Sequence, residues 1–162
     1  MALNAYMRLT GEVQGEIKGS VTQAGREDSI MVIGCSHSVK SPRDAASGLP
    51  TGKRQHKPFI VTKELDKSTP LLYNVLTNNE NIPSLEIQFW RPSRTGKEFH
   101  FFSVELVNAN VAGIRSEMLN NRYPENMQHK EREHISFTYQ KITQRFEDGG
   151  IMSEDDWETP VS

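Results

Sequence analysis

The chain has 162 residues, with 19 lysines and arginines, 21 aspartates and glutamates, and a formal net charge of -2. This length fits one domain with a single core. A dedicated nucleic-acid-binding domain normally carries a large basic excess, which this composition lacks. No stretch of the sequence approaches the ~20 apolar residues of a membrane span. We therefore expect one globular domain over residues 1–162, without a nucleic-acid partner and without insertion into a membrane.

The one cysteine, Cys35, closes the apolar run 30–35. A lone cysteine excludes an intrachain disulfide, so the core depends on packing alone, and we expect Cys35 to be a buried, inert thiol. The first 13 residues hold one cation, Arg8, and no continuous apolar run, which differs from a secretory signal. We expect synthesis in a reducing cytoplasm and, if the protein is exported, a route without a cleaved signal.

Apolar residues alternate with polar ones along most of the chain, which is the period of a half-buried strand. In chain order this pattern predicts strands over residues 5–9, 29–39, 59–62, 85–89, 102–115 with a bulge near 108–110, and 135–139. Glycines or Arg91-Pro92 end several of these runs. The fold class that follows is mainly β, either a small barrel or two packed sheets.

One segment has the period of a helix. Ser68-Thr69-Pro70 combines a hydroxyl cap with an early proline, which is typical of a helix start. Two apolar pairs at i,i+4 spacing follow, and Asn78 and Asn79 are stop residues that tolerate a left-handed backbone. We expect one flanking helix over about 69–79, packed on the sheet or on a neighbouring subunit.

The connection over residues 41–58 is far longer than a hairpin turn of two to five residues. It contains three prolines and two glycines and has no apolar periodicity. Long connections of this kind are uncommon in compact domains unless they serve a function or are disordered. We expect a long loop that projects from the domain.

Two binding functions for this loop were weighed. Residues 48–53 resemble a phosphate-binding loop, but the spacing is one residue short, Arg54 replaces the magnesium-binding hydroxyl, and no helix follows. The basic run 53–57 lacks interleaved aromatics, so pairing with acidic groups across a protein interface is favoured over nucleic acid. No cofactor is predicted.

Catalytic and metal-binding patterns are also missing. Among the five histidines only His129 and His134 lie close in sequence, and their spacing fits no zinc pattern, so we expect solvated loop residues. No nucleophile elbow occurs. Residues 154–156 form an acidic run that we expect to be a solvated turn anchored by Trp157. The sequence therefore predicts no catalytic residue and no enzyme.

Several segments in a fixed order resemble the Hcp family, the haemolysin-coregulated proteins of bacterial type VI secretion. They are residues 6–12, 14–20, 41–58, 66–70 and 137–142, and the similarity extends over essentially the whole chain. The resemblance implies a small β-barrel of two sheets with one helix. It also implies homohexameric rings that stack into a hollow tube.

The same resemblance implies the partners. These are other copies of the chain, the VgrG spike at the tip of the tube, the contractile sheath that drives it, and effector proteins inside the lumen. It implies synthesis in the bacterial cytoplasm and secretion through the type VI system without a signal peptide. Because the sequence stops soon after the last predicted strand, we expect no appended effector domain.

Within this framework the extended loop corresponds to a segment that reaches towards a neighbouring ring. We expect its ring-to-ring contacts to come from Arg43, Asp44, Lys53, Arg54 and Lys57, with Leu49 at an apolar tip. Ser36 is a candidate for the lumen wall. The alternative is a stand-alone β-barrel binding module for a peptide or small ligand, and a hexameric ring would separate the two hypotheses.

Overall fold

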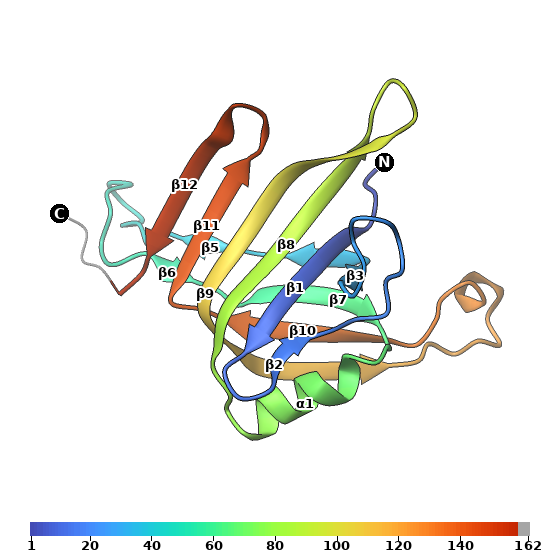
Figure 1. Ribbon diagram of the computed structural model, residues 1–162. Coiled ribbons are helices and arrows are strands. Elements are labelled where there is room, and N and C mark those ends of the chain that lie inside the picture. The colour runs from blue at the N-terminus through green and yellow to red at the C-terminus, as the bar shows by residue number, and fades with distance from the viewer. Residues whose placement is uncertain (159–162) are drawn as a thin grey trace.

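The computed structural model describes residues 1–158 and shows a mainly β architecture with one α-helix (Figure 1). The strands are β1 Ala5–Gly11, β2 Gly15–Ile17, β3 Ile30–Val32, β4 Gly34–Ser36, β5 Val39–Lys40, β6 Gln55–His56, β7 Phe59–Glu64, β8 Ile82–Pro92, β9 Glu98–Glu117, β10 Arg132–Thr138, β11 Lys141–Phe146 and β12 Ile151–Asp156. The helix α1 spans Thr69–Thr77, and two short 3-10 turns cover Pro124–Asn126 and Asp148–Gly150.

Two sheets form the body of the molecule. In the first sheet, β1 pairs with β2, β3 and β8, and the order continues through β9 and β11 to β12. In the second sheet the order is β4, β7, β10 and then β9 again. All of these pairs are antiparallel, and the strands of the two sheets cross at a large angle (Figure 1).

Two segments of chain run from one sheet into the other. The 20-residue β9 pairs with β8 and β11 in its first half and with β10 in its second half. Asn108, with a left-handed φ of 51°, lies near the crossing, and the β9–β10 register shifts opposite Ser136 and Phe137. On the other side, β3 pairs with β1 and β4 pairs with β7. The sheets are thus joined at both edges, which confirms the predicted small barrel.

This crossing explains why the strand predicted over residues 29–39 was wrong as a single element. The backbone N–H of Ile33 donates to the carbonyl of Thr62 at 2.9 Å, which is the point where the chain leaves the first sheet and enters the second. The segment is consequently divided into β3, β4 and β5. Cys35 lies on β4 at a sheet edge and is exposed, so the expectation of a buried thiol was also wrong.

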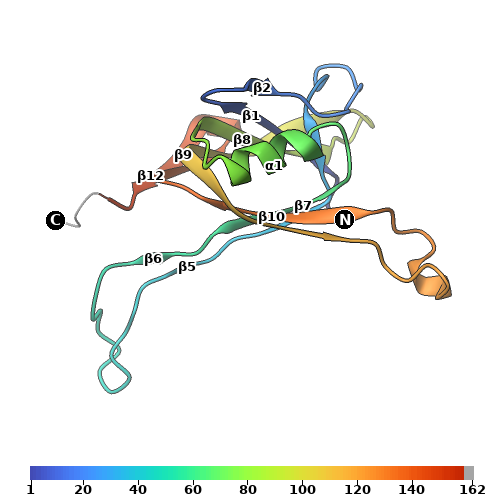
Figure 2. The same ribbon diagram turned by 90° about the horizontal axis from the view of Figure 1, so that it is seen from below.

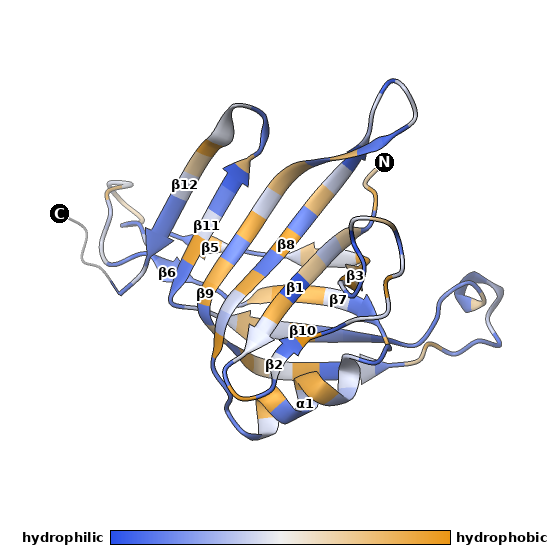
Figure 3. Cartoon of the chain, viewed as in Figure 1, coloured by the Kyte–Doolittle hydropathy of each residue, from blue (hydrophilic) through white to orange (hydrophobic). Residues whose placement is uncertain are grey.

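The core fills the space between the sheets and follows the predicted alternation. Residues on the inner side of β1, β8 and β9, such as Met7, Ile87 and Leu106, have no exposed surface. Figure 3 shows apolar and polar residues alternating along these strands, whereas the long connections are mostly hydrophilic. At ~25 cal/mol per Å2 of apolar surface removed from water, this core is the main source of stability.

Helix α1 lies across one end of the barrel between the two sheets (Figure 2). Leu72 and Val75 are buried against the core, which confirms the predicted apolar side. Ser68 occupies the N-cap position, but its hydroxyl donates to the Asp66 carboxylate at 2.5 Å rather than capping the helix. Asn79 has a φ of 48°, as expected for a stop residue.

Candidate functional site

The extended loop is a long hairpin that projects from the barrel (Figure 2). At its root β5 and β6 pair through Val39 with His56 and Lys40 with Gln55. Farther out, an isolated bridge joins Arg43 to Pro50. The predicted projection is therefore confirmed, but the loop has backbone pairing that the sequence did not indicate.

The tip of this hairpin is closed by one carboxylate. Asp44 accepts hydrogen bonds from the Ser47 N–H at 2.8 Å and from the Ser47 hydroxyl at 2.7 Å, and these bonds lower the pKa of Asp44. The Asp44 N–H donates to the carbonyl of Leu49 at 2.8 Å. Leu49 itself is 64% exposed. The tip is thus an ordered turn that presents one apolar side chain to solvent.

The predicted contact residues divide into two groups. Arg43, Asp44, Leu49, Lys53 and Lys57 are exposed along the hairpin. Arg54 instead turns back onto the barrel, where its Nε lies 2.5 Å from Asp155 Oδ2 and one terminal nitrogen lies 2.8 Å from Asp155 Oδ1. That terminal nitrogen also donates to the Asp156 carbonyl at 2.9 Å. Bidentate pairs of this kind fix geometry as well as charge, so Arg54 ties the loop to β12.

Two imidazoles extend this contact into the barrel. His56 Nε2 lies 2.7 Å from Asp155 Oδ2, and its Nδ1 lies 2.8 Å from the Tyr139 hydroxyl. The same hydroxyl lies 2.6 Å from His37 Nε2. The His37 ring also stacks on Phe59, with ring centroids 5.2 Å apart. We call His37, Arg54, His56, Tyr139 and Asp155 the anchor cluster.

The environment of the anchor cluster shifts four pKa values, and that of Arg54 is raised by its hydrogen bond to Asp155. Hydrogen bonds from Arg54, and then from His56, lower the pKa of Asp155. Burial, with a smaller effect of the Asp155 charge, raises the pKa of Tyr139 to about 12. Burial, followed by repulsion from His56, lowers the pKa of His37. Asp155 is therefore held ionised, whereas Tyr139 and His37 favour their neutral forms.

The C-terminal segment differs from its prediction because it pairs with β11. Residues 154–156 belong to β12, which pairs with β11 over six residues, instead of forming a solvated turn. The side chain of Trp157 does anchor this end of the chain, since its Nε1–H donates to the Tyr139 carbonyl. His134 is likewise a strand residue, bonded to Thr62 at 2.9 Å and to Glu117 at 3.0 Å, so the solvated-loop prediction was wrong for it.

Ser36 lies on the outer face of the second sheet. It is directly opposite Ile60, which is opposite Ser136, which is opposite Gly113. Directly opposed residues in antiparallel strands share a face. Next to this row, whose polar members are Ser36 and Ser136, lie Arg115, Glu117, Arg132 and His134, where the His134 hydrogen bond lowers the pKa of Glu117. The outward position of Ser36 is as expected, and its place in a lumen stays a prediction.

An apolar row crosses the first sheet beyond the closed core. Phe89, Phe102, Phe146 and Ile151 lie directly opposite one another on β8, β9, β11 and β12, and we call them the apolar row. Exposure rises along it, to 38% at Phe146 and 69% at Ile151. Figure 1 shows the upper ends of these four strands extending beyond β7 and β10. Exposed apolar patches of this kind mark interaction surfaces.

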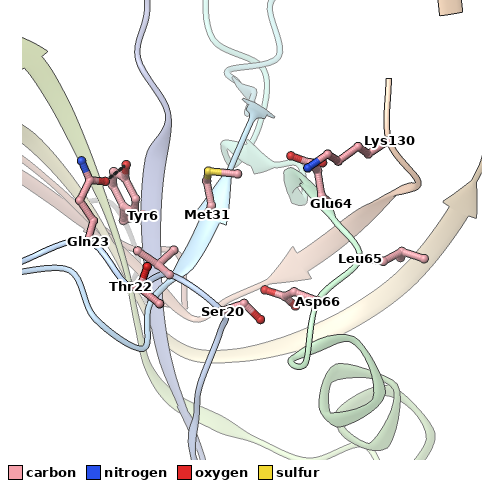
Figure 4. Close-up of a pocket in the computed structure, with 10 residues that line it drawn as sticks. Tyr6, Ser20, Thr22, Gln23, Met31, Glu64, Leu65, Asp66 and Lys130 are labelled. Atoms are coloured by element: carbon pink, nitrogen blue, oxygen red, sulfur yellow. Dashed lines mark hydrogen bonds between the residues drawn. The ribbon is translucent and has the colours of Figure 1, made fainter. Parts of the chain in front are cut away.

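A groove of about 370 Å3 beside β1 is where the alternative binding-module hypothesis would place a ligand (Figure 4). Three of its polar lining groups already have partners within the subunit. The Tyr6 hydroxyl donates to Gln23 at 2.8 Å. Asp66 forms an ion pair with Lys63 and accepts a hydrogen bond from the Ser68 hydroxyl. The groove therefore gives no support to a stand-alone binding module.

Residues 1–158 contain neither a cluster of metal-binding side chains nor a membrane-spanning helix. No grouping of three or more histidine, cysteine or carboxylate side chains is placed to hold a metal ion in this part of the chain. Within the same residues, no helix has the length and apolar character needed to cross a membrane.

Sequence reasoning missed the anchor cluster because its members are far apart in the chain. The available signal was charge complementarity, since a basic run at 53–57 and an acidic run at 154–156 both lacked partners in the sequence. That signal identifies no particular pair among several lysines, arginines and carboxylates. Only the sheet topology, which brings β12 beside the loop root, selects Arg54 and Asp155.

The chain is similar to known proteins over its whole length. Residues 6–146 match the family described as "Type VI secretion system effector, Hcp". The "Major exported protein" of Pseudomonas aeruginosa is 41% identical, with 100% of this chain and 99% of that protein aligned.

Solved structures agree with this assignment. A crystal structure of an Hcp protein superposes with a TM-score of 0.91 at 36% identity, covering 97% of this chain and 99% of the other. The secreted protein Hcp3 from Pseudomonas aeruginosa superposes with a TM-score of 0.79 at 33% identity, covering 96% and 99%. Family model, full-length relative and barrel geometry all lead to the same assignment: the chain belongs to the Hcp family of type VI secretion proteins.

Proposed function

We propose that this chain assembles into hexameric rings that stack into the hollow tube of a type VI secretion system, and that it leaves the cell with that tube. The observation that carries the ring is the apolar row, which continues the core face of the first sheet into solvent. Sheet edges with exposed apolar faces require cover. A head-to-tail contact between identical copies supplies that cover at every subunit when the rotation closes.

The stacking part of the proposal concerns the extended loop. Its exposed tip carries Arg43, Asp44 and Leu49, and Lys53 and Lys57 follow along the hairpin. We propose that these five residues make the ring-to-ring contacts, while Arg54 fixes the loop to its own subunit. Six weak loop contacts per ring would add through multivalency.

The other partners rest on family membership alone. We propose that the tube carries a VgrG spike at its tip, lies inside the contractile sheath and holds effector proteins in its lumen. Ser36 and the polar row around it are the proposed lumen wall. A structural tube subunit needs no catalytic residue, and we propose that the protein is not an enzyme.

The ring is tested by native mass spectrometry and negative-stain microscopy of the purified protein. We expect a hexamer and six-fold rings. Substituting Ile151→Lys should shift the protein towards monomers, because a charge placed in an apolar contact is costly to desolvate. The side chain is 69% exposed in the single subunit, so folding should be unaffected.

The matched control is Val13→Lys, at an 85% exposed position in the β1–β2 turn, which should leave the hexamer intact. A wild-type protein that stays monomeric at high concentration would overturn the ring proposal. If Ile151→Lys forms rings as readily as Val13→Lys, the apolar row is not the contact.

A further inference from the structure

The root of the extended loop is tied to the barrel by a continuous chain of hydrogen bonds. It runs from Arg54 to Asp155, then to His56, to the Tyr139 hydroxyl and to His37. Its five residues lie in five different segments of the chain: the loop, β12, β6, the β10–β11 turn and the β4–β5 connection. The His56 side chain is only 4% exposed. The anchor cluster is therefore enclosed at His56 and Tyr139, whereas the Asp155 side chain stays 36% exposed.

The protons in this chain can be placed from the chemistry of each group. A carboxylate only accepts, so the His56 Nε2 carries the hydrogen that is donated to Asp155. With a neutral His56, its Nδ1 accepts the Tyr139 hydroxyl, and the Tyr139 oxygen accepts from His37 Nε2–H. Every link then holds one hydrogen.

The cluster accommodates one additional proton but not two. If His56 becomes an imidazolium, it donates to both Asp155 and Tyr139, and the Tyr139 hydroxyl turns to donate to His37 Nε2, which requires the neutral His37 to carry its hydrogen on Nδ1 instead. If His37 is protonated as well, both imidazoles donate to the same phenol oxygen. The hydroxyl hydrogen then has no acceptor within the cluster, and two cations face each other across one oxygen atom.

We propose that the anchor cluster is an acid-sensitive device that fixes the root of the extended loop on β12 at neutral pH and frees it when His37 and His56 are both protonated. The groups that face the two imidazoles are Asp155 on β12 and Tyr139 from the β10–β11 turn, and Arg54 shares the Asp155 carboxylate with His56. The proposal concerns the single subunit and does not depend on ring formation.

The direction of the pH effect follows from the environment of His37. Its pKa is lowered, so the anchored state binds a proton less tightly than a free histidine does. The anchored state is therefore fully stabilised above the ordinary histidine pKa of ~6.5, and the stabilisation is lost as the pH falls through the lowered pKa. Asp155, whose pKa is also lowered, stays ionised over that range. As the pH falls, the contact between His37 and Tyr139 is therefore lost first, and the Arg54–Asp155 ion pair is lost only at lower pH.

Hydrogen exchange of peptides covering residues 41–54 tests this, with rates corrected for the intrinsic pH dependence. We expect loop amides of the wild type to open about fivefold or more faster at about pH 4.5 than at about pH 7.5. Tyr139→Phe keeps the ring but removes the bridging hydroxyl, so its loop should exchange fast at both pH values. Asp155→Asn should also exchange fast at both, because it removes the charged partner of Arg54 and His56.

The matched control is Tyr73→Phe, which removes an exposed hydroxyl on α1 and should behave as the wild type. The imidazole signals of His37, followed by NMR, should titrate over the range in which loop exchange rises. A wild-type loop that exchanges equally at both pH values overturns the proposal, as does a Tyr139→Phe loop as protected as the wild type at neutral pH. Native mass spectrometry of the same samples reports ring formation separately, so the two proposals can fail independently.

Discussion

At the scale of single residues, the most constrained group is the buried lysine under the start of α1. Lys63 and Glu133 have no exposed side-chain surface, and Lys63 Nζ lies 2.5 Å from Glu133 Oε1 and 3.0 Å from Asp66 Oδ1. Thr69, the first helical residue, donates to the same Glu133 oxygen at 3.0 Å. The ion pair therefore links β7 and β10 to the helix. Lys63 offsets part of the cost of burying these charges by bonding to several polar groups at once, although Glu133 Oε2 has no hydrogen-bond partner among the described residues.

Substituting Lys63→Met should lower the free energy of unfolding by about 3–5 kcal/mol, because Glu133 and Asp66 are left without their cation in a buried site. The double variant Lys63→Met with Glu133→Leu should recover part of this loss, since no unpaired buried charge remains at position 133. Urea denaturation followed by circular dichroism measures both.

The comparison variant is Lys67→Met, a side chain that is 56% exposed and 3.9 Å from Asp28. It should change stability by no more than ~0.5 kcal/mol. If Lys63→Met unfolds at the same urea concentration as Lys67→Met, the buried pair contributes nothing to the fold.

Single residues also show the limit of the sequence analysis. Apolar alternation predicted the buried faces of β1, β8 and β10 well, because burial of an apolar side chain needs no specific partner. Lys63 and Glu133 sit at buried positions of their strands, yet a charged side chain is normally expected in solvent. Their burial depends on each other and on a pairing of β7 with β10 that the sequence does not specify.

At the scale of elements, the extended loop separates into a tip and an anchored root. Because Arg43 and Pro50 already form a bridge, the residues between them can be replaced by a two-residue Asn-Gly turn without opening the hairpin. This replacement of residues 44–49 should leave the barrel and the ring intact and weaken stacking of rings. Sedimentation velocity and electron microscopy of stacked rings measure the change.

A milder variant is Leu49→Ser, which removes only the exposed apolar side chain and should weaken stacking less than the Asn-Gly replacement does. The variant Arg54→Met tests the root instead of the tip, since it should loosen the contact between the loop root and β12 while the tip stays complete. Stacking that is unchanged in the Asn-Gly variant would exclude the tip from the ring-to-ring contact.

The elements that the sequence predicted are those with a local signal. Helix α1 has a proline at its start, apolar i,i+4 pairs and a left-handed asparagine at its end. In contrast, β12 contains Ser153, Glu154 and Asp155, which have low strand propensity, and it is a strand because β11 pairs with it. The division of residues 30–40 into three strands likewise reflects pairing with β1 and β7, which are distant in sequence.

At the scale of the whole molecule, stability should be distributed unevenly around the barrel. The centre of the first sheet is β8 and β9, which are paired on both sides and bury Leu85, Ile87 and Leu106 completely. In contrast, within residues 1–158 β12 pairs with β11 alone, and its first four residues are exposed. Amides open locally where few buried contacts oppose the motion. The outer strand should therefore open well before the central ones.

This gradient gives a test that connects the subunit to the assembly. In a monomeric variant such as Ile151→Lys, the amides of β12 should exchange much faster than those of β8, which should approach the protection set by global unfolding. In the wild-type ring, β12 should gain protection, because the neighbouring copy covers the apolar row and the edge beside it, whereas β8 should change little. Exchange of peptides covering residues 151–156 and 82–92 in the two proteins measures this difference. Equal β12 protection in monomer and ring would place the subunit contact elsewhere on the barrel.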